Sequence, residues 1–298
     1  KGSFYGEVDI IDGLRFKSVA SIDYTSYDQT NFTPSFLGYD GGYYGYTKDG
    51  VASGTNAHRT LIGTFWENTL TYDKMWNGEV HHLNAVIGHA WEQQKASWFS
   101  ATGKGYPDDN ILTGLGSAQT AASVDGADPE SKVSLLSFYG RLNYTLLDRY
   151  LFTFTARSDA SSKFAKGHRV GFFPSGAIAW RISQEEWLRD TKWIDEIKIR
   201  ASIGKTGTQS ISDYMYLSLY RPGAYAGSSA LYPSQMGNDA IEWESTNQWD
   251  LGLDYSFFNG RLSGTFGYYH KITDGALLSV PIAPSSGYSN LTTNIARI

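Results

Sequence analysis

The sequence predicts an all-β chain, an antiparallel transmembrane β-barrel segment, and three observations lead to this fold class. Apolar and polar side chains alternate with a period of two through three successive segments between Phe138 and Ser183. Side chains of a strand point alternately to opposite faces, so each segment has an apolar and a polar face. Most predicted strands hold nine or more residues, near the length that crosses a bilayer at a tilt. Short turns also alternate with long loops, as they do in outer-membrane barrels.

The alternation assigns side chains to two predicted surfaces. The apolar set is expected to face lipid and includes Phe152, Phe154, Ile178, Trp180 and Ile182. The opposite set is expected to face a polar lumen, and its arginines to form an internal polar ladder: Arg141, Arg157, Arg181 and Arg200. This facing predicts that Phe154→Arg impairs barrel assembly and that Arg157→Ala leaves assembly nearly intact.

The strand candidates come in pairs joined by turn signals. Asp12-Gly13, Asn77-Gly78 and Asn259-Gly260 are dipeptides typical of tight hairpins. In chain order the pairs are Phe4–Ile11 with Leu14–Tyr24, Arg59–Tyr72 with Val80–Glu92, Ser134–Leu146 with Arg149–Ser158, and Trp249–Phe257 with Arg261–Lys271. With the segments around Ile178 and Ile197–Ile203, about ten strands are predicted, and an eleventh begins near Thr292.

The remaining stretches are expected to be loops, with one short helix. The loop candidates are rich in Gly, Ser, Asp, Tyr and Pro: Thr25–His58, Gln93–Val133, Asp159–Arg169 and Thr206–Ser245. The turn after Ile182 reads Ser183-Gln184-Glu185-Glu186, which is the pattern of a capping box. A short helix through about Arg189 is therefore predicted.

Composition excludes several classes of protein. No stretch approaches 18 uninterrupted apolar residues, so a transmembrane helix is excluded. The mean hydropathy of −0.35 is compatible with a barrel, because half of each strand and the loops are polar. The absence of Cys excludes disulfides and thiolate metal sites. A net charge of −5 without any long basic run argues against nucleic-acid binding.

No catalytic or metal-binding constellation is found, and no cofactor is expected. His81 and His82 are adjacent in a strand and would point to opposite faces, so they cannot share a metal. The acidic pair Asp108-Asp109 follows Pro107 in a predicted loop, where solvated charge is the ordinary interpretation and calcium ligation the alternative. The chain is therefore not expected to be an enzyme.

Binding chemistry is better represented than catalysis. The predicted loops are dense in aromatic rings, on which sugar rings can stack while nearby carboxylates bond the hydroxyls. The ligand-contact candidates are Tyr43, Tyr44, Trp98, Phe99, Tyr106, Asp108, Asp109 and Tyr225. Tyrosine is equally suited to a packed loop or to a protein interface.

Several blocks from Gly140 onward resemble one protein family. They are, in order, Gly140–Tyr144, Asp148–Leu151, Arg157–Phe164, Gly171–Ser175, Ala179–Ser183, Lys198–Gln209, Trp243–Thr246 and Gly252–Leu262. Together they resemble the SusC/RagA family of TonB-dependent outer-membrane transporters. The match is good from Leu136 onward and looser over Phe4–Glu92.

The resemblance implies a barrel of roughly 22 strands with a plug in its lumen. Residues 1–298 would then be one partial barrel domain, about half of a barrel, with the plug and the final strands absent. It also implies import of oligosaccharides or peptides across the outer membrane of a Gram-negative, Bacteroidetes-type cell. The implied partners are a SusD-like surface lipoprotein, TonB through the missing N-terminal region, and outer-membrane lipids.

Two alternatives remain open at this point. A secreted, soluble β-rich carbohydrate-binding or glycoside-hydrolase domain would also show alternating strands, because a second sheet can cover an apolar face. A TonB-dependent siderophore or vitamin receptor would share the barrel but carry another cargo. The order of the family blocks favours the SusC-like transporter.

Overall fold

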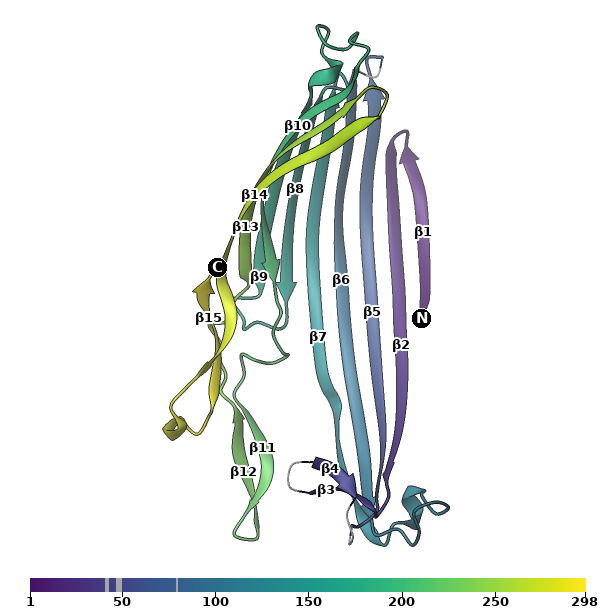
Figure 1. The fold of residues 1–298 in the computed structure, drawn as a ribbon, viewed down its shortest axis with the longest axis vertical. Coiled ribbons are helices and arrows are strands. Elements are labelled where there is room, and N and C mark those ends of the chain that lie inside the picture. The colour runs from purple at the N-terminus through teal and green to yellow at the C-terminus, as the bar shows by residue number, and fades with distance from the viewer. Residues whose placement is uncertain (41–42, 47–49, 79) are drawn as a thin grey trace. The chain divides into compact units, whose positions relative to one another are not determined.

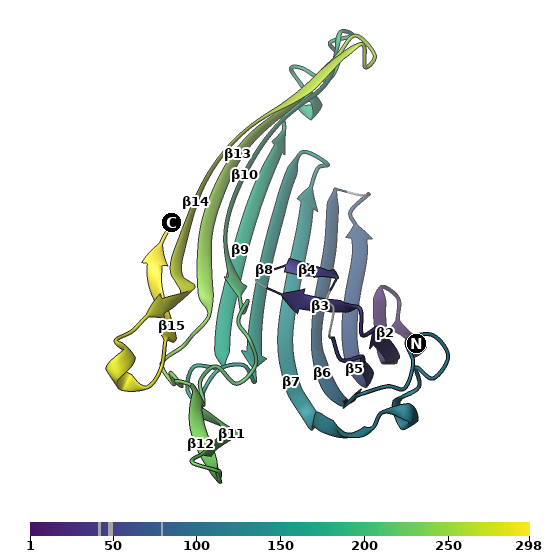
Figure 2. The same ribbon diagram turned by 60° about the horizontal axis from the view of Figure 1, so that its bottom comes forward.

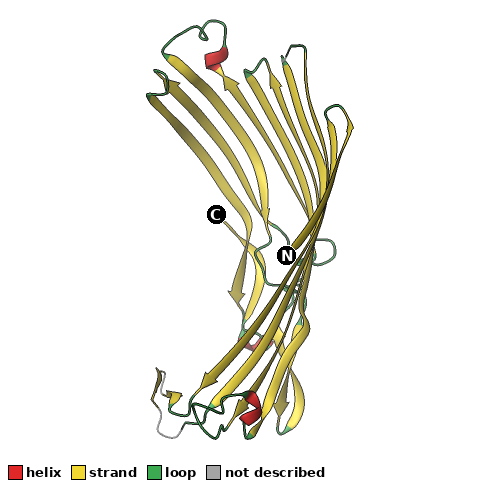
Figure 3. Cartoon of the chain, turned by 90° about the vertical axis from the view of Figure 1, so that its right-hand side faces the viewer, coloured by secondary structure: helices red, strands yellow, loops and turns green. Residues whose placement is uncertain are grey.

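The structure is a computed structural model that describes residues 1–40, 43–46, 50–78 and 80–298. Side chains are described except at 38–40, 43–46, 121–122 and 127–129. Strands dominate the described chain, and the helical segments are three short 3-10 turns (Figure 3). The predicted all-β, antiparallel class is therefore confirmed.

Eleven strands form one sheet whose spatial order follows the chain, β1-β2-β5-β6-β7-β8-β9-β10-β13-β14-β15 (Figure 1). Their bounds are β1 Gly2–Ile11, β2 Leu14–Thr33, β5 Ser53–Trp76, β6 His81–Lys104, β7 Thr120–Leu146, β8 Tyr150–Ser161, β9 Val170–Arg181, β10 Ile194–Thr208, β13 Glu244–Phe257, β14 Leu262–Pro281 and β15 Asn290–Arg297. Two separate hairpins pair β3 Leu37–Asp40 with β4 Tyr43–Tyr46, and β11 Leu219–Tyr225 with β12 Ser228–Gln235. The 3-10 turns are η1 Leu115–Ser117, η2 Ile182–Gln184 and η3 Pro284–Ser286.

The chain divides into two compact units. One comprises residues 1–3, 21–64 and 93–133, and the other comprises residues 4–20, 65–92 and 134–298. In the second unit, the hairpin β11–β12 lies beyond the Thr208 end of β10 (Figure 2). The expectation of one barrel domain over residues 1–298 stays a prediction.

The predicted tight turns are present. Asn77 and Gly78 have φ of 56° and 64°, and Leu147 and Asp148 have φ of 56° and 54°, the left-handed values that the two central residues of a type I′ turn adopt. Because antiparallel strands reverse direction each time, alternate connections fall at the same end of the sheet. We call the end with the tight turns β1–β2, β5–β6, β7–β8 and β13–β14 the turn end; it also carries the longer β9–β10 connection, residues 182–193. We call the opposite end the loop end.

The strands are longer than the sequence pattern predicts. β5 and β6 each hold 24 residues and β7 holds 27, so much of Thr25–His58 and Gln93–Val133 is strand and not loop. Alternation fades along these extensions because both faces carry polar residues there, which removes the pattern but not the backbone pairing. The prediction of loops over these two ranges was therefore wrong in large part.

The turn after β9 also departs from expectation. β9 ends at Arg181, so Ile182 is not a strand residue but the first residue of η2. The capping box is wrong, because the buried Ser183 hydroxyl has no hydrogen-bond partner among the described residues and no side-chain cap is formed. Glu185, one residue before the predicted partner, makes the contacts that organise this turn.

Candidate functional site: two faces of one sheet

The apolar face of the second unit is carried by neighbouring side chains in register. Phe154 pairs with Leu142 on one side and Gly176 on the other, and Gly176 pairs with Ile203. Large apolar side chains remain exposed here, with Phe154 54% and Ile178 57% exposed. Others on the same face are Leu142, Phe152, Trp180, Ile199, Ile203, Leu251, Leu253, Phe266 and Tyr268. A contiguous apolar surface of this kind marks contact with a membrane or another protein.

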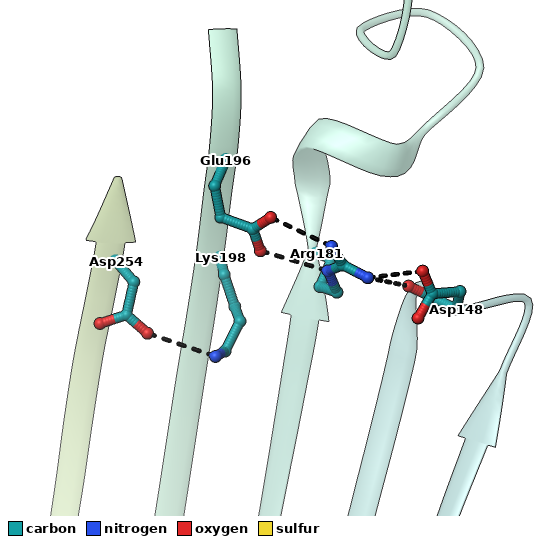
Figure 4. A network of polar contacts seen from close by, with 5 residues as sticks. All are labelled: Asp148, Arg181, Glu196, Lys198 and Asp254. Atoms are coloured by element: carbon teal, nitrogen blue, oxygen red, sulfur yellow. Dashed lines mark hydrogen bonds and ion pairs between the residues drawn. The ribbon is translucent and has the colours of Figure 1, made fainter. Parts of the chain in front are cut away.

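The polar face carries ion pairs near the turn end (Figure 4). Arg181 donates to Asp148 in the β7–β8 turn and to Glu196 on β10, with Nη2–Oε2 at 3.2 Å. Lys198 Nζ lies 3.5 Å and Arg200 Nε 3.3 Å from Asp254 Oδ2. Each of these cations has a carboxylate partner from a neighbouring strand or turn, so the charge on this part of the face is compensated within the protein.

A second polar group lies toward the loop end of β7 and β8. Arg157 donates from Nε to Asp159 at 2.7 Å and from Nη2 to Ser137 at 2.9 Å. Its guanidinium also lies 5.8 Å from the ring centroid of Tyr139. The Asp159 side chain is only 9% exposed, so its carboxylate has little contact with water and is stabilised by the guanidinium of Arg157. Arg141 is exposed, and among the described residues its one hydrogen-bond partner is Asn143, at 3.3 Å.

A buried aromatic cluster at the loop end was not identified from the sequence as a site. Phe164, which is fully buried, and Phe173 both pack against Trp243, with ring centroids 5.2 and 5.4 Å apart. The indole of Trp243 donates to the backbone oxygen of Arg169 at 2.8 Å. Gly207 packs directly beneath the Phe173 ring. Four of the family-like sequence blocks thus meet in this cluster. The presence of these blocks in one sequence was the signal from which the cluster could have been found.

Glu185 gathers three donors at the turn end. Tyr150 Oη donates to it at 2.7 Å, Trp180 Nε1 at 2.9 Å and Arg149 Nη1 at 3.1 Å. These hydrogen bonds, that of Tyr150 first, lower the pKa of the Glu185 carboxyl, against the opposing effect of its burial. The carboxylate therefore ties the start of β8 and the end of β9 to the turn.

The ligand-contact candidates come from separate elements of the chain. Trp98 and Phe99 lie within β6 and not in a loop. Tyr106 packs edge-on to Phe32, with centroids 5.0 Å apart, and its hydroxyl is buried without a partner among the described residues. Tyr225 is exposed at the tip of the β11–β12 hairpin. The side chains of Tyr43 and Tyr44 are not among those that the structure describes.

The two acidic candidates accept hydrogen bonds within the connections: Asp108 from its own loop, and Asp109 from the connection that contains Ser35. Asp108 accepts backbone N–H groups of Asn110 and Ile111 at 2.7 and 2.6 Å, which lowers the pKa of its carboxyl. Asp109 accepts from the N–H and the hydroxyl of Ser35, both at 2.6 Å. These contacts favour a structural role for both carboxylates, and ligand contact by any of the eight candidates stays a prediction.

The histidines and acidic groups of the described residues do not gather into a metal site. His81 bonds Tyr144 Oη at 2.7 Å, whereas His82 bonds Asp73 at 3.2 Å. Among the residues that the structure describes, no three metal-ligating side chains lie together. No helix in the described part of the chain has the length and apolar character needed to cross a membrane.

Comparison with known proteins identifies the family. Residues 3–298 match the family described as TonB dependent receptor-like, beta-barrel. The chain is 32% identical over 306 residues to TonB-dependent receptor P3 of Formosa agariphila, covering 100% of this chain and 29% of that protein. It is also 32% identical over 312 residues to TonB-dependent receptor SusC of Bacteroides thetaiotaomicron, covering 99% of this chain and 29% of SusC. The chain thus spans less than a third of these curated relatives.

Solved structures agree on the fold. A chain of the RagAB peptide transporter superposes with a TM-score of 0.87 at 24% identity, covering 99% of this chain and 32% of that one. The copper transporter OprC superposes with a TM-score of 0.53 at 16% identity, covering 98% and 41%. The SusC/RagA resemblance is confirmed, and since the family consists of receptors and transporters, so is the expectation of a non-enzyme. The chain belongs to the TonB-dependent receptor-like β-barrel family.

Proposed function

We propose that this chain forms part of the wall of an outer-membrane nutrient importer in a Gram-negative bacterium. The observation that carries the proposal is the two-faced sheet, with an exposed apolar face and an opposite face of compensated ion pairs. Lipid is the natural solvent for the first face, and a polar lumen for the second. Family membership over nearly the whole chain supports the same assignment.

The importer would transform nothing chemically. The polar face lines a route along which hydrated cargo passes, and compensated pairs such as Arg181–Glu196 offer that cargo no strong unpaired charge. Energy would come from TonB, acting on protein segments that lie outside residues 1–298. A SusD-like surface lipoprotein would deliver cargo at the loop end, where the long connections lie.

Oligosaccharide is the first proposed cargo class and peptide the second. The support is the 32% identity to SusC and the aromatic residues Trp98 and Phe99 of β6 and Tyr225 of β11. The peptide class is supported by the fold shared with the RagAB peptide transporter. The secreted-domain alternative is disfavoured, because the apolar face is exposed and the family model covers residues 3–298.

Uptake by cells that carry the full-length receptor tests the proposal. Cells with and without the gene would be offered fluorescent oligosaccharides, fluorescent peptides and a ferric siderophore, before and after dissipation of the proton-motive force. We expect energy-dependent accumulation of an oligosaccharide or a peptide only in cells with the gene. Accumulation of the siderophore alone would favour the siderophore-receptor alternative, and recovery of the receptor outside the outer membrane would contradict the proposal.

A further inference from the structure

Two adjoining hollows lie on the apolar face of β8, β9, β10 and β13. Their volumes are about 720 and about 520 Å³. They share Phe154, Gly176, Ile203 and Trp249, so they form one continuous groove, which we call the outer groove. Gly176 lies between Phe154 and Ile203 in the register, and its missing side chain leaves the groove open.

One end of the outer groove is polar and positively charged. Lys205 and Asn247 are cross-strand partners in β10 and β13, and His270 is the partner of Trp249 on the next strand. All three line the groove together with Ile272. Lys205 makes no ion pair or hydrogen bond with any residue that the structure describes, whereas Lys198 on the opposite face is paired with Asp254. An unpaired ammonium on an apolar face needs a polar partner from outside the protein.

The height of Lys205 on the sheet indicates what that partner is. Trp193, Phe257 and Phe258 form an aromatic cluster at the turn end, with centroids 5.7 and 6.1 Å from the Trp193 ring. Ten residues separate Phe257 from Asn247 along β13, which is about 33 Å of strand and, at a barrel tilt of about 40°, about 25 Å of height. This equals the height of the apolar band of an outer-membrane barrel, so Lys205 lies at the opposite membrane boundary, where lipid phosphates are found.

We propose that the outer groove binds one molecule of lipid A, the phosphorylated and multiply acylated glycolipid of the outer leaflet. A phosphate contacts Lys205, with Asn247 and His270 as hydrogen-bond donors, and an acyl chain lies along the groove past Trp249 and over Gly176. This assignment rests on the proposed function, because the loop end must face outward for the outer leaflet to meet Lys205. Charge complementarity at one end and apolar lining along the rest specify an anionic amphiphile.

The test uses the full-length receptor purified from outer membranes in mild detergent. Lipid A retained per receptor is quantified by mass spectrometry, and the thermal midpoint is followed on adding lipid A or phosphatidylglycerol. We expect wild type to retain about one lipid A and to be stabilised by lipid A more than by phosphatidylglycerol. Lys205→Gln and Gly176→Leu should each lower retention about tenfold, and Lys205→Arg should restore it.

Lys271→Gln is the matched control, since it removes the same charge next to His270 but on the opposite face. Gly176→Leu is suited to the test because a Cβ there meets only Thr153 O at 3.9 Å, so the fold can accept it. Equal retention in Lys205→Gln and wild type, equal loss in Lys271→Gln, or equal stabilisation by phosphatidylglycerol would overturn the lipid site. Recovery of the receptor outside the outer membrane would instead overturn the proposed function.

Discussion

Two residues of β8, Phe154 and Arg157, differ sharply in the contacts that the protein gives their side chains. Phe154 leaves half of its surface exposed, although burial would stabilise the chain by about 1.5–3 kcal/mol. Arg157, three residues later on the other face, contacts Asp159, Ser137 and Tyr139. Among the described residues, the charges of the polar face therefore have partners, whereas large side chains of the apolar face remain exposed. This difference indicates that the two faces of the sheet lie in different environments. The charges of the polar face are neutralised by other residues of the chain, whereas the apolar face lacks a comparable protein covering among the described residues.

The largest expected effect comes from placing a charge on the apolar face. Phe154→Arg should destabilise the assembled receptor by about 2–4 kcal/mol, because a guanidinium near the bilayer midplane loses its hydration. Thr155→Arg introduces the same side chain one residue away on the polar face and should be tolerated. Heat-modifiable gel mobility and urea unfolding of the full-length receptor measure both. Equal damage from the two variants would contradict the assignment of the faces.

Removal of Arg157 is the next largest effect, and the contacts revise the expectation drawn from the sequence. Arg157→Ala leaves the Asp159 carboxylate without its cation, and this should cost about 1–3 kcal/mol instead of nearly nothing. Adding Asp159→Asn should recover part of the loss, since the unpaired charge is then removed. Arg141→Ala, which removes a single hydrogen bond to Asn143 among the described residues, should lie within experimental error of wild type. Unfolding free energies of Arg157→Ala, Asp159→Asn, the double variant and Arg141→Ala would decide, and a loss in the double variant equal to the sum of the single losses would count against coupling.

The aromatic cluster at the loop end should be sensitive to added volume. In Gly207→Val the new side chain meets the Phe173 ring, which is held in place by Trp243, and overpacking should cost about 1–3 kcal/mol. Gly267→Val is the control, since its Cβ meets nothing within 4 Å. Thermal unfolding of both variants provides the measurement. Similar midpoints for the two would show that the Phe173 slot is not tightly packed.

The smallest expected effect is a loss of stability at acidic pH that depends on Glu185. Because the folded state lowers the pKa of Glu185, the stabilisation from its carboxylate is complete above the unfolded pKa of about 4.3 and is lost as the pH falls through the folded value. Glu185→Gln should therefore weaken the receptor at neutral pH and show less further loss on acidification. Glu186→Gln, at an exposed neighbour, should follow wild type. Unfolding midpoints from about pH 6 to pH 3 test this, and parallel curves for Glu185→Gln and wild type would refute it.

Sequence reasoning succeeded where alternation or turn chemistry is local. Strand pairing around Asn77-Gly78 and Asn259-Gly260 follows from residues that adopt positive φ readily, and the strand ends next to these turns were located within a few residues, although the far ends were not. Helix η2 was misjudged because the Ser183 pattern fits a capping box, while the decisive contacts to Glu185 come from Arg149 and Tyr150, more than 30 residues away.

The site was predictable only in part, for a similar reason. Which residues share a face follows from the period of two, but which arginine meets which carboxylate depends on register, as for Arg181 with Asp148 and Glu196. The cluster of Phe164, Phe173 and Trp243 joins segments up to 79 residues apart, which no local pattern specifies. The outer groove likewise arises from Gly176 lying opposite Phe154 and Ile203 in register.

Spin-label accessibility along β8 tests the central claim most directly. The chain has no cysteine, so single cysteines at Phe152, Thr153, Phe154 and Thr155 can be labelled specifically within it. In outer-membrane vesicles containing the full-length receptor, labels at Phe152 and Phe154 should collide readily with oxygen, which concentrates in hydrocarbon, and rarely with a water-soluble nickel complex. Labels at Thr153 and Thr155 should show less contact with oxygen. Accessibility that does not alternate with a period of two, or nickel contact as strong at Phe154 as at Thr155, would contradict a lipid-facing apolar surface.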